Sequence, residues 1–420
     1  MPTSVTSPLP AARERALLLT LAAVQFTHIM DFMIMMPLGA NLMRVFGIGP
    51  AQFSWLVAAY GIAAATAGFL GGFVLDRFDR RIALLTLYTG FCLATLACAF
   101  APNFEFLLLA RLIAGAFGGV AGSVVTATIG DAIPADRRGR AMGTVMAAFP
   151  LASIFGVPAG LFLAGWLEWH APFLLLGILS LGILLLARRS LPPVRSHRST
   201  HHPVRQMWNI VTHPIHARAF LLTAFLIFAG ASVIPFMAPT MVENVGLDEK
   251  WQLPLVYMCG GACAFFTMPW LGRMADRHDK LHVLIGISLL SIPATLVITR
   301  LGPGPLGVTL FVTSLFFIAM SGRFAPAMAL ITNAVEARYR GGFMSVNSAV
   351  QQAAGGLANV VAGLLISRGA HGELVGYPRT GWISCAAVVI TLLLAAWLRR
   401  AAPHAARNPG TQPAAEQTAG

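Results

Sequence analysis

Long, continuously apolar runs dominate the chain, and they restrict its possible folds more than any other feature. Each run reaches the roughly 20 residues that a helix needs to cross a bilayer. About twelve such runs can be counted between residues 16 and 400. Strands of a membrane β-barrel would be shorter, about ten residues, and would alternate in polarity. The runs therefore predict an all-α membrane protein with about twelve transmembrane helices.

Charge content supports this fold class and excludes others. Only 11% of the 420 residues are charged, whereas an ordinary soluble domain carries about 25%. The net charge of +13 could indicate nucleic-acid binding, but that would need a basic face on a soluble fold. Most of the 29 Lys and Arg residues instead lie in loops at one end of the predicted helices. The positive-inside rule then places both termini in the cytoplasm and the protein in the cytoplasmic (inner) membrane, with anionic lipid head groups as partners.

Two motifs indicate that the chain is a pair of parallel repeats. The pattern G-x-x-x-D-R-x-D-[RK] occurs at residues 72–80 and again at residues 272–280. Arg138 and Arg340, each followed by Gly, recur at nearly the same spacing. Folds built from such repeats hold a substrate site near the middle of the membrane, between the repeats. We therefore expect two six-helix bundles around one central site.

The boundaries follow from the apolar runs. We expect a cytoplasmic tail over residues 1–15, a bundle over 16–188, a cytoplasmic linker over 189–216, a second bundle over 217–400 and a flexible tail over 401–420. The linker is polar and rich in proline and histidine. A metal site in it is conceivable but lacks a fixed ligand spacing, so a solvated linker is expected. Cys259 and Cys263, four residues apart, are likewise expected to be buried hydrophobes rather than ligands.

These motifs resemble the signatures of the major facilitator superfamily. The repeated pattern is similar to the loop that links its helices two and three, and eight and nine. Residues 111–118 resemble its fourth-helix motif, and residues 340–352 resemble helix eleven of the twelve-span bacterial drug/proton antiporter (sugar-efflux-like) group. Gly156, Pro158 and Gly160 resemble its antiporter-type fifth helix. The sequence departs from the family at Asp79 and Asp279, where glycine is usual, and by the extra residue between Gly156 and Pro158.

Ionisable residues inside apolar helices are expensive and are functional candidates by default. Asp31 is a deep carboxylate with His28 one turn away, and Arg111 heads the fourth-helix motif. We expect Asp31 to bind a proton or a cationic substrate, and the resemblance implies that Arg111 takes part in proton coupling. The alternatives are a structural Asp31 paired permanently with an arginine, a structural Arg111 bonded to the helix backbone, and a packing role for His28.

Further polar residues are candidates for substrate binding. Arg323 would be a substrate contact or a gate residue. Asn347, Gln351 and Gln352 make helix eleven unusually polar. They could line a cavity, or they could bond neighbouring helices, where each contact is worth about 0.6 kcal/mol.

The cytoplasmic loops are expected to form a gate. Its residues would be Gly72, Asp76, Arg77, Arg80, Arg81, Arg138, Gly272, Asp276, Arg277, Lys280 and Arg340. The glycines would allow close helix approach. The resemblance places Asp76 beside the start of helix eleven and Asp276 beside helix five, where a helix N-terminus favours a carboxylate by about 0.3–1 kcal/mol. Alternatively, these loops only fix orientation.

The most consistent function is secondary transport, as a proton-coupled exporter of a small molecule that works as a monomer without a cofactor. A proton symporter or uniporter that imports a metabolite is the main alternative, followed by a non-transporting receptor. An enzyme is disfavoured, because the chain has neither a His/Cys/Asp cluster nor a sizeable soluble domain. ATP-driven pumping is disfavoured because the phosphate-binding pattern G-x-x-x-x-G-K-[ST] is missing from the sequence.

Overall fold

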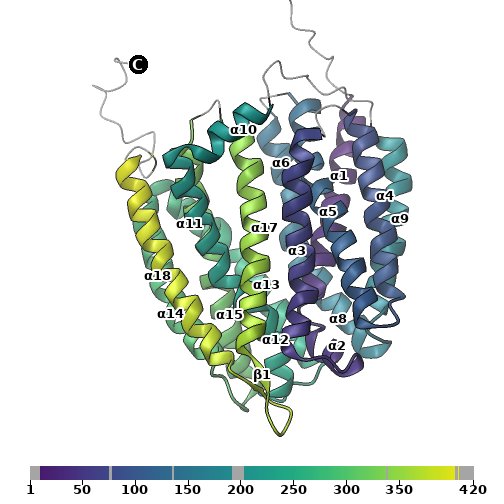
Figure 1. Cartoon of the computed structure of the whole chain (residues 1–420), viewed down its shortest axis with the longest axis vertical. Coiled ribbons are helices and arrows are strands. Elements are labelled where there is room, and N and C mark those ends of the chain that lie inside the picture. The colour runs from purple at the N-terminus through teal and green to yellow at the C-terminus, as the bar shows by residue number, and fades with distance from the viewer. Residues whose placement is uncertain are drawn as a thin grey trace, which may run out of the picture. The chain divides into compact units, whose positions relative to one another are not determined.

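A computed structural model describes residues 10–74, 78–134, 137–191, 203–336, 339–402 and 405. Within these residues the chain is almost entirely helical, which confirms the predicted fold class (Figure 1). Eleven described segments are long and apolar enough to cross a membrane. The helix at Arg340–Leu365 has sufficient length, 26 residues, but is more polar than these eleven.

The described helices divide into two compact units. Unit 1 comprises residues up to Met35 and Ala59–His201, and unit 2 comprises Met36–Ala58 and His202–Gly420. The first nine α-helices are α1 (Ala11–Ile34), α2 (Gly39–Val45), α3 (Pro50–Val74), α4 (Arg80–Ala99), α5 (Phe104–Ala132), α6 (Arg138–Met146), α7 (Ala148–Leu151), α8 (Val157–Trp166) and α9 (Ala171–Ser190). A π-helical turn at Ala152–Gly156 joins α7 to α8.

The remaining elements all belong to unit 2. They are α10 (Pro203–Thr212), α11 (Pro214–Ala231), α12 (Ile234–Glu243), α13 (Gln252–Arg277), α14 (Lys280–Ile298), α15 (Leu306–Gly322), α16 (Phe324–Ala334), α17 (Arg340–Leu365), β1 (Ser367–Arg368), β2 (Leu374–Val375) and α18 (Tyr377–Ala401). The two short strands pair in an antiparallel hairpin, which the apolar runs did not predict.

Several predicted spans are broken near proline. The first run, expected to be one helix over 16–43, ends as α1 at Ile34 and resumes as α2 at Gly39, with Pro37 in the turn between them. Proline lacks an N–H and clashes with the preceding helical turn, so it interrupts helices. The span expected over 217–241 likewise breaks between α11 and α12, where Pro235 occupies the first turn of α12.

The predicted linker contains more structure than expected. Helix α9 continues to Ser190, α10 lies within the linker, and α11 begins at Pro214. His216 is buried, and its Nδ1 donates to the carbonyl of Ile210 over 3.0 Å, which corrects the expectation of a solvated histidine there. Residues 192–202, including three of the linker histidines, lie outside the described residues.

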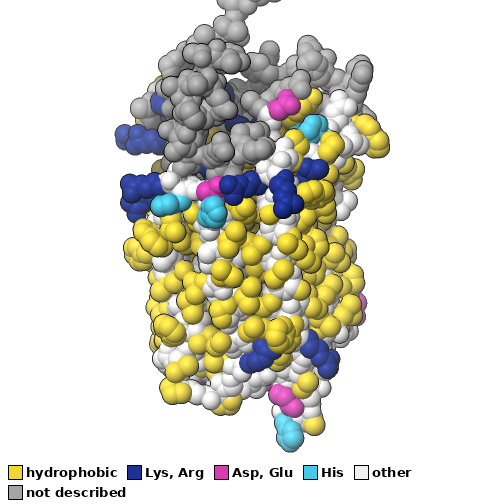
Figure 2. All heavy atoms as spheres, turned by 90° about the vertical axis from the view of Figure 1, so that its left-hand side faces the viewer, with side chains coloured by type: hydrophobic (Ala, Val, Ile, Leu, Met, Phe, Trp, Pro, Cys, Tyr) yellow, Lys and Arg dark blue, Asp and Glu magenta, His cyan; other side chains and the backbone are white. Residues whose placement is uncertain are grey.

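Each unit has its own apolar core and also presents apolar side chains outward. In unit 1 the core gathers side chains of α1, α4, α5 and α9, and in unit 2 those of α11, α14, α16, α17 and α18. Large side chains such as Leu289, Phe311 and Leu393 are exposed. Figure 2 shows hydrophobic side chains across the middle of the face drawn, with charged ones toward its ends. This distribution is the one that a bilayer requires, because its core cannot hydrate charges.

Candidate functional site

A buried ion pair lies at the centre of unit 1. Arg111 of α5 places Nη1 2.7 Å from Oδ2 of Asp31 on α1, and neither side chain has any exposed surface. The same nitrogen donates to the main-chain carbonyl of Asp31 over 3.1 Å. Nε and Nη2 of Arg111 meet no hydrogen-bond acceptor among the described residues. The pair thus joins two helices, and part of the guanidinium is buried without a hydrogen-bond acceptor among the described residues.

Two further side chains complete the surroundings of this pair, and sequence reasoning missed both. Thr95 of α4 donates to Oδ1 of Asp31 over 3.3 Å. The ring of Tyr60 on α3 lies 4.6 Å from the guanidinium carbon of Arg111, a cation–π contact. Tyr60 gave a weak signal, as a polar aromatic residue in the middle of an apolar run, whereas Thr95 gave none. Four helices therefore hold the two charges.

His28 joins this site through Tyr60. Its Nδ1 and the Tyr60 hydroxyl are 2.6 Å apart, and its ring also meets the edge of Phe91. The structure thus brings together three residues that were predicted from the sequence, His28, Asp31 and Arg111. Tyr60, which was not predicted, connects His28 to the other two. His28 both packs against its neighbours and forms a specific hydrogen bond.

The glycine stripe after Arg111 allows this arrangement. A methyl group on Gly115 would collide with the main chain of Tyr60, and one on Gly118 would lie 3.1 Å from Nδ1 of His28. A methyl group on Gly122 would lie 3.3 Å from Nε2 of the same histidine. These glycines therefore allow close packing along this face of α5, because they make room for the side chains that surround the ion pair.

The antiporter-type motif also contacts the helix that carries Asp31. A methyl group on Gly156 would lie 2.6 Å from Sδ of Met30, and one on Gly160 would lie 2.6 Å from Cδ1 of Ile34. The π-helical turn immediately before Val157 and Pro158 widens the helix at this point. The motif thus packs tightly on α1 one residue from the buried carboxylate.

The other predicted binding residues belong to unit 2. Arg323 lies at the break between α15 and α16, is 1% exposed, and directs Nη2 at the sulfur of Met320. Its Nε and Nη1 meet no acceptor among the residues described. Asn347 of α17 is buried and accepts a hydrogen bond from Thr223 of α11 over 2.7 Å, so it does bond a neighbouring helix. Gln351 and Gln352 are partly exposed.

The loop residues form contacts inside unit 1. Asp79 caps α4 by accepting from the main-chain N–H groups of Arg81 and Ile82 at 2.8 and 3.3 Å. Arg80 forms an ion pair with Asp131 at 2.9 Å. Elsewhere in this unit, Arg81 donates to the carbonyl of Arg188 and Arg138 to that of Ile133. These contacts connect the ends of α4, α5, α6 and α9.

Unit 2 repeats the capping arrangement. Asp279 accepts from the N–H groups of Leu281 and His282, and it pairs with Arg399 at 2.8 Å. Lys280 is buried, whereas Asp276, Arg277 and Arg340 are exposed.

The glycine part of the gate prediction needs correction. A methyl group on Gly272 would meet no atom within 4 Å in the part of the chain that the structure describes, so close helix approach does not require this glycine. Gly72 lies in α3, but its surroundings, like Asp76 and Arg77, fall outside the described residues.

No group of three His, Cys, Asp or Glu residues that could hold a metal ion occurs among the described residues. His213 and His216 do approach each other, with ring centroids 4.5 Å apart.

Comparison with known proteins supports the fold described above. The profile of the Major Facilitator Superfamily matches residues 21–322 and 255–419. A chloramphenicol resistance protein of Streptomyces lividans is 25% identical over 372 residues, which is 85% of this chain and 92% of that protein. The uncharacterized MFS-type transporter YceJ of Bacillus subtilis (strain 168) is 26% identical over 367 residues, 84% of this chain and 90% of that one.

Solved structures share the fold. A bacterial homologue of the human lysosomal transporter Spinster, in an inward-facing and unoccupied conformation, superposes with a TM-score of 0.77 at 18% identity, covering 95% of this chain and 100% of that one. A D-xylose-proton symporter gives 0.75 at 17% identity, with the same coverage.

Proposed function

We propose that this chain exports a small molecule in exchange for protons. The chain belongs to the Major Facilitator Superfamily and is therefore a secondary transporter rather than an enzyme. The observation that carries this proposal is the wholly buried pair of Asp31 and Arg111. A carboxylate inside a membrane protein can bind a proton, and here a proton on Asp31 would change the net charge of the buried pair.

The pair supplies two states of different charge. With Asp31 ionised, the pair is neutral and held by a direct hydrogen bond. A proton on Asp31 removes the negative charge and leaves Arg111 uncompensated. Breaking a buried pair in this way is strongly unfavourable, by about 3–5 kcal/mol. Proton binding therefore favours any rearrangement that gives Arg111 water or another partner, and a proton moving down a membrane potential releases about 2.3 kcal/mol per 100 mV.

The packing around Asp31 supports a link to helix movement. Gly156 and Gly160 lie against the two residues of α1, Met30 and Ile34, that flank the carboxylate position. The π-helical turn beside them is a local departure from regular helix, and such turns frequently occur at functional sites. A movement of α1 at Asp31 would thus displace the contacts that α1 makes with α8.

The relative from Streptomyces lividans supports chloramphenicol as a first substrate to test. The experiment is expression of the chain in an efflux-deficient, chloramphenicol-sensitive bacterium. The wild type is expected to raise the inhibitory concentration, and Asp31→Asn at equal abundance is expected to lose that gain. Everted membrane vesicles with an acid interior should accumulate radiolabelled chloramphenicol, and nigericin should abolish the accumulation.

Each part of the proposal has its own contrary result. Accumulation that nigericin leaves intact would refute exchange with protons. Equal resistance from Asp31→Asn would refute the role of this carboxylate. Wild-type cells no more resistant than vector controls would refute chloramphenicol as the substrate.

A further inference from the structure

The segment Met36–Ala58 belongs to unit 2, although it lies in the first sixth of the chain. It contains α2 and the first turns of α3. Helix α3 then continues without interruption from Ala58 into Ala59, which belongs to unit 1. This hairpin is thus tied to unit 1 through the covalent chain at both ends, and to unit 2 through packing.

Apolar contacts seat the hairpin on unit 2 at close range. A methyl group on Gly39 of α2 would lie 2.7 Å from Cγ of Pro239 in α12. The ring of Phe53 meets that of Phe236 edge-on, with centroids 5.7 Å apart. A methyl group on Gly363 of α17 would collide with the side chain of Ser54.

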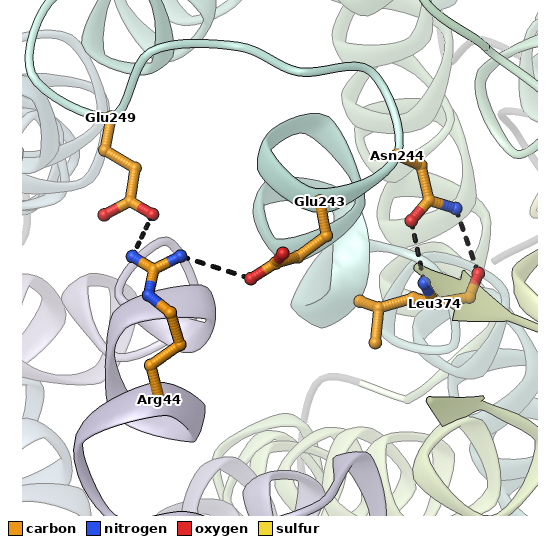
Figure 3. Close-up of polar contacts among 5 residues, drawn as sticks. All are labelled: Arg44, Glu243, Asn244, Glu249 and Leu374. Atoms are coloured by element: carbon orange, nitrogen blue, oxygen red, sulfur yellow. Dashed lines mark hydrogen bonds and ion pairs between the residues drawn. The ribbon is translucent and has the colours of Figure 1, made fainter. Parts of the chain in front are cut away.

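One arginine adds a polar connection at the rim of this contact (Figure 3). Arg44, in the last turn of α2, donates Nη1 to Glu243 over 3.2 Å and Nη2 to Glu249. The arginine side chain is 45% exposed and the two carboxylates are 20% and 26% exposed. Burial lowers the pKa of the Arg44 guanidinium, but its pairing with Glu249 and Glu243 outweighs this effect and raises the pKa above its ordinary value.

Hydrogen bonds fix the residues that stand next to the two carboxylates in the chain. Asn244, next to Glu243, exchanges two hydrogen bonds with the main chain of Leu374, at 2.8 and 3.0 Å (Figure 3). Asp248, next to Glu249, accepts from the N–H groups of Lys250 and Trp251. The main chain beside both glutamates is therefore fixed, and the two carboxylates meet one guanidinium.

We propose that Arg44, Glu243 and Glu249 are an outer latch, which holds the hairpin Met36–Ala58 against unit 2 and is released when the transporter opens outward. The predicted orientation places this hairpin on the outer side of the membrane. Partly exposed ion pairs are weak and are screened by salt. Such a latch biases the closed state without preventing opening, as a cycle between two states requires.

The test uses Ser54→Cys as a reporter. Ser54 is 1% exposed, its side chain faces Gly363, and cysteine is close to it in size. A membrane-impermeant thiol reagent is added outside intact cells, and the modified peptide that contains position 54 is quantified by mass spectrometry. The native cysteines can remain, because the readout is specific to this peptide.

Adding Arg44→Gln to the Ser54→Cys parent is expected to accelerate thiol modification at position 54 by about three- to tenfold, the size expected for two partly exposed ion pairs. Arg44→Lys keeps the charge and should restore most of the slow rate. Raised salt should accelerate labelling in the Ser54→Cys parent and have little effect on the Arg44→Gln variant.

The matched control is Arg300→Gln, which removes another exposed arginine that stacks near Trp382 and takes no part in the latch. The proposal is overturned if Arg44→Gln labels at the parent rate, or if Arg300→Gln accelerates labelling equally. The proposal goes beyond the export function, and its test needs neither a substrate nor a pH gradient. A failure of either idea is therefore distinguishable from a failure of the other.

Discussion

Asp31 and Arg111 stand 80 residues apart in the chain, yet a hydrogen bond of 2.7 Å joins their side chains where neither is exposed. Asp31→Ala leaves the guanidinium uncompensated, and we expect it to lower the free energy of unfolding by about 3–5 kcal/mol. Adding Arg111→Met should recover a large part of that loss, because no charge then remains buried. Denaturant titration in mixed micelles measures both variants.

The double variant also contains its own control. If the pair contributes nothing as a pair, the losses of the two single variants simply add. An additive result would contradict the coupling of these two charges in the folded protein.

Gly115 faces the main chain of Tyr60, so Gly115→Ala should force α5 away from α3. We expect a loss of about 1–3 kcal/mol, the usual range for overpacking. Gly130→Ala is the matched control on the same helix, since a methyl group there meets nothing within 4 Å. That variant should be neutral or slightly stabilising, because alanine is the better helix former. Thermal unfolding of both proteins tests the contrast, and equal losses would contradict it.

Asp79 caps α4, and its replacement separates capping from charge. Asp79→Ala should cost about 0.5–2 kcal/mol, whereas Asp79→Gly should cost only a few tenths, because glycine is itself a tolerated N-cap residue. This difference also explains why a position that usually holds glycine in the family can hold aspartate here. Thermal unfolding midpoints should decrease in the order wild type, Asp79→Gly, Asp79→Ala. A lower midpoint for Asp79→Gly than for Asp79→Ala would be inconsistent with a capping role.

The hydrogen bond between Thr223 of α11 and Asn347 of α17 can show whether the polar residues of α17 serve helix packing or transport. Thr223→Val removes the donor to Asn347 with little change of shape, and we expect a loss of about 0.6 kcal/mol, as for other hydrogen bonds between membrane helices. Transport per folded molecule should be unchanged. A large fall in transport with unaltered stability would instead assign Asn347 to the substrate path.

Arg323 differs from Arg111 because no ion pair forms with it among the described residues. An uncompensated buried charge is costly, so Arg323→Met should raise the unfolding midpoint of the purified protein, by the equivalent of at least about 1 kcal/mol. Arg323→Lys, which keeps the charge, should not. If Arg323→Met unfolds more easily than wild type, the guanidinium has a stabilising partner.

Sequence reasoning identified the buried charges of unit 1 because a charged residue inside an apolar run is costly and therefore needs a structural or functional reason. Asp31 and Arg111 could be singled out in this way, and a pairing of Asp31 with an arginine could be considered in advance. The partners Thr95 and Tyr60 were not predicted, because Thr95 gives no signal in an apolar run and Tyr60 only a weak one, and the packing of four helices selects these two.

The helix breaks were harder to predict for a different reason. Hydropathy depends on side-chain polarity and contains no information on backbone conformation. It therefore predicts one span over residues 16–43, although the chain turns at Pro37. The membership of Met36–Ala58 in unit 2 depends on contacts with α12 and α17, which are close in space and distant in sequence.

The π-helical turn at Ala152–Gly156 contains one residue more than a regular α-helical turn would. The direction in which the side chains of α8 point therefore depends on the number of residues in this stretch. Each residue of an α-helix advances the side chains by about 100°. A single deletion between Gly156 and Gly160, after this turn, would rotate Gly160 by about 100° off Ile34 and place a bulkier neighbour against α1. This stretch should therefore tolerate substitutions at its exposed positions far better than deletions, so its packing on α1 depends on its length more than on its composition.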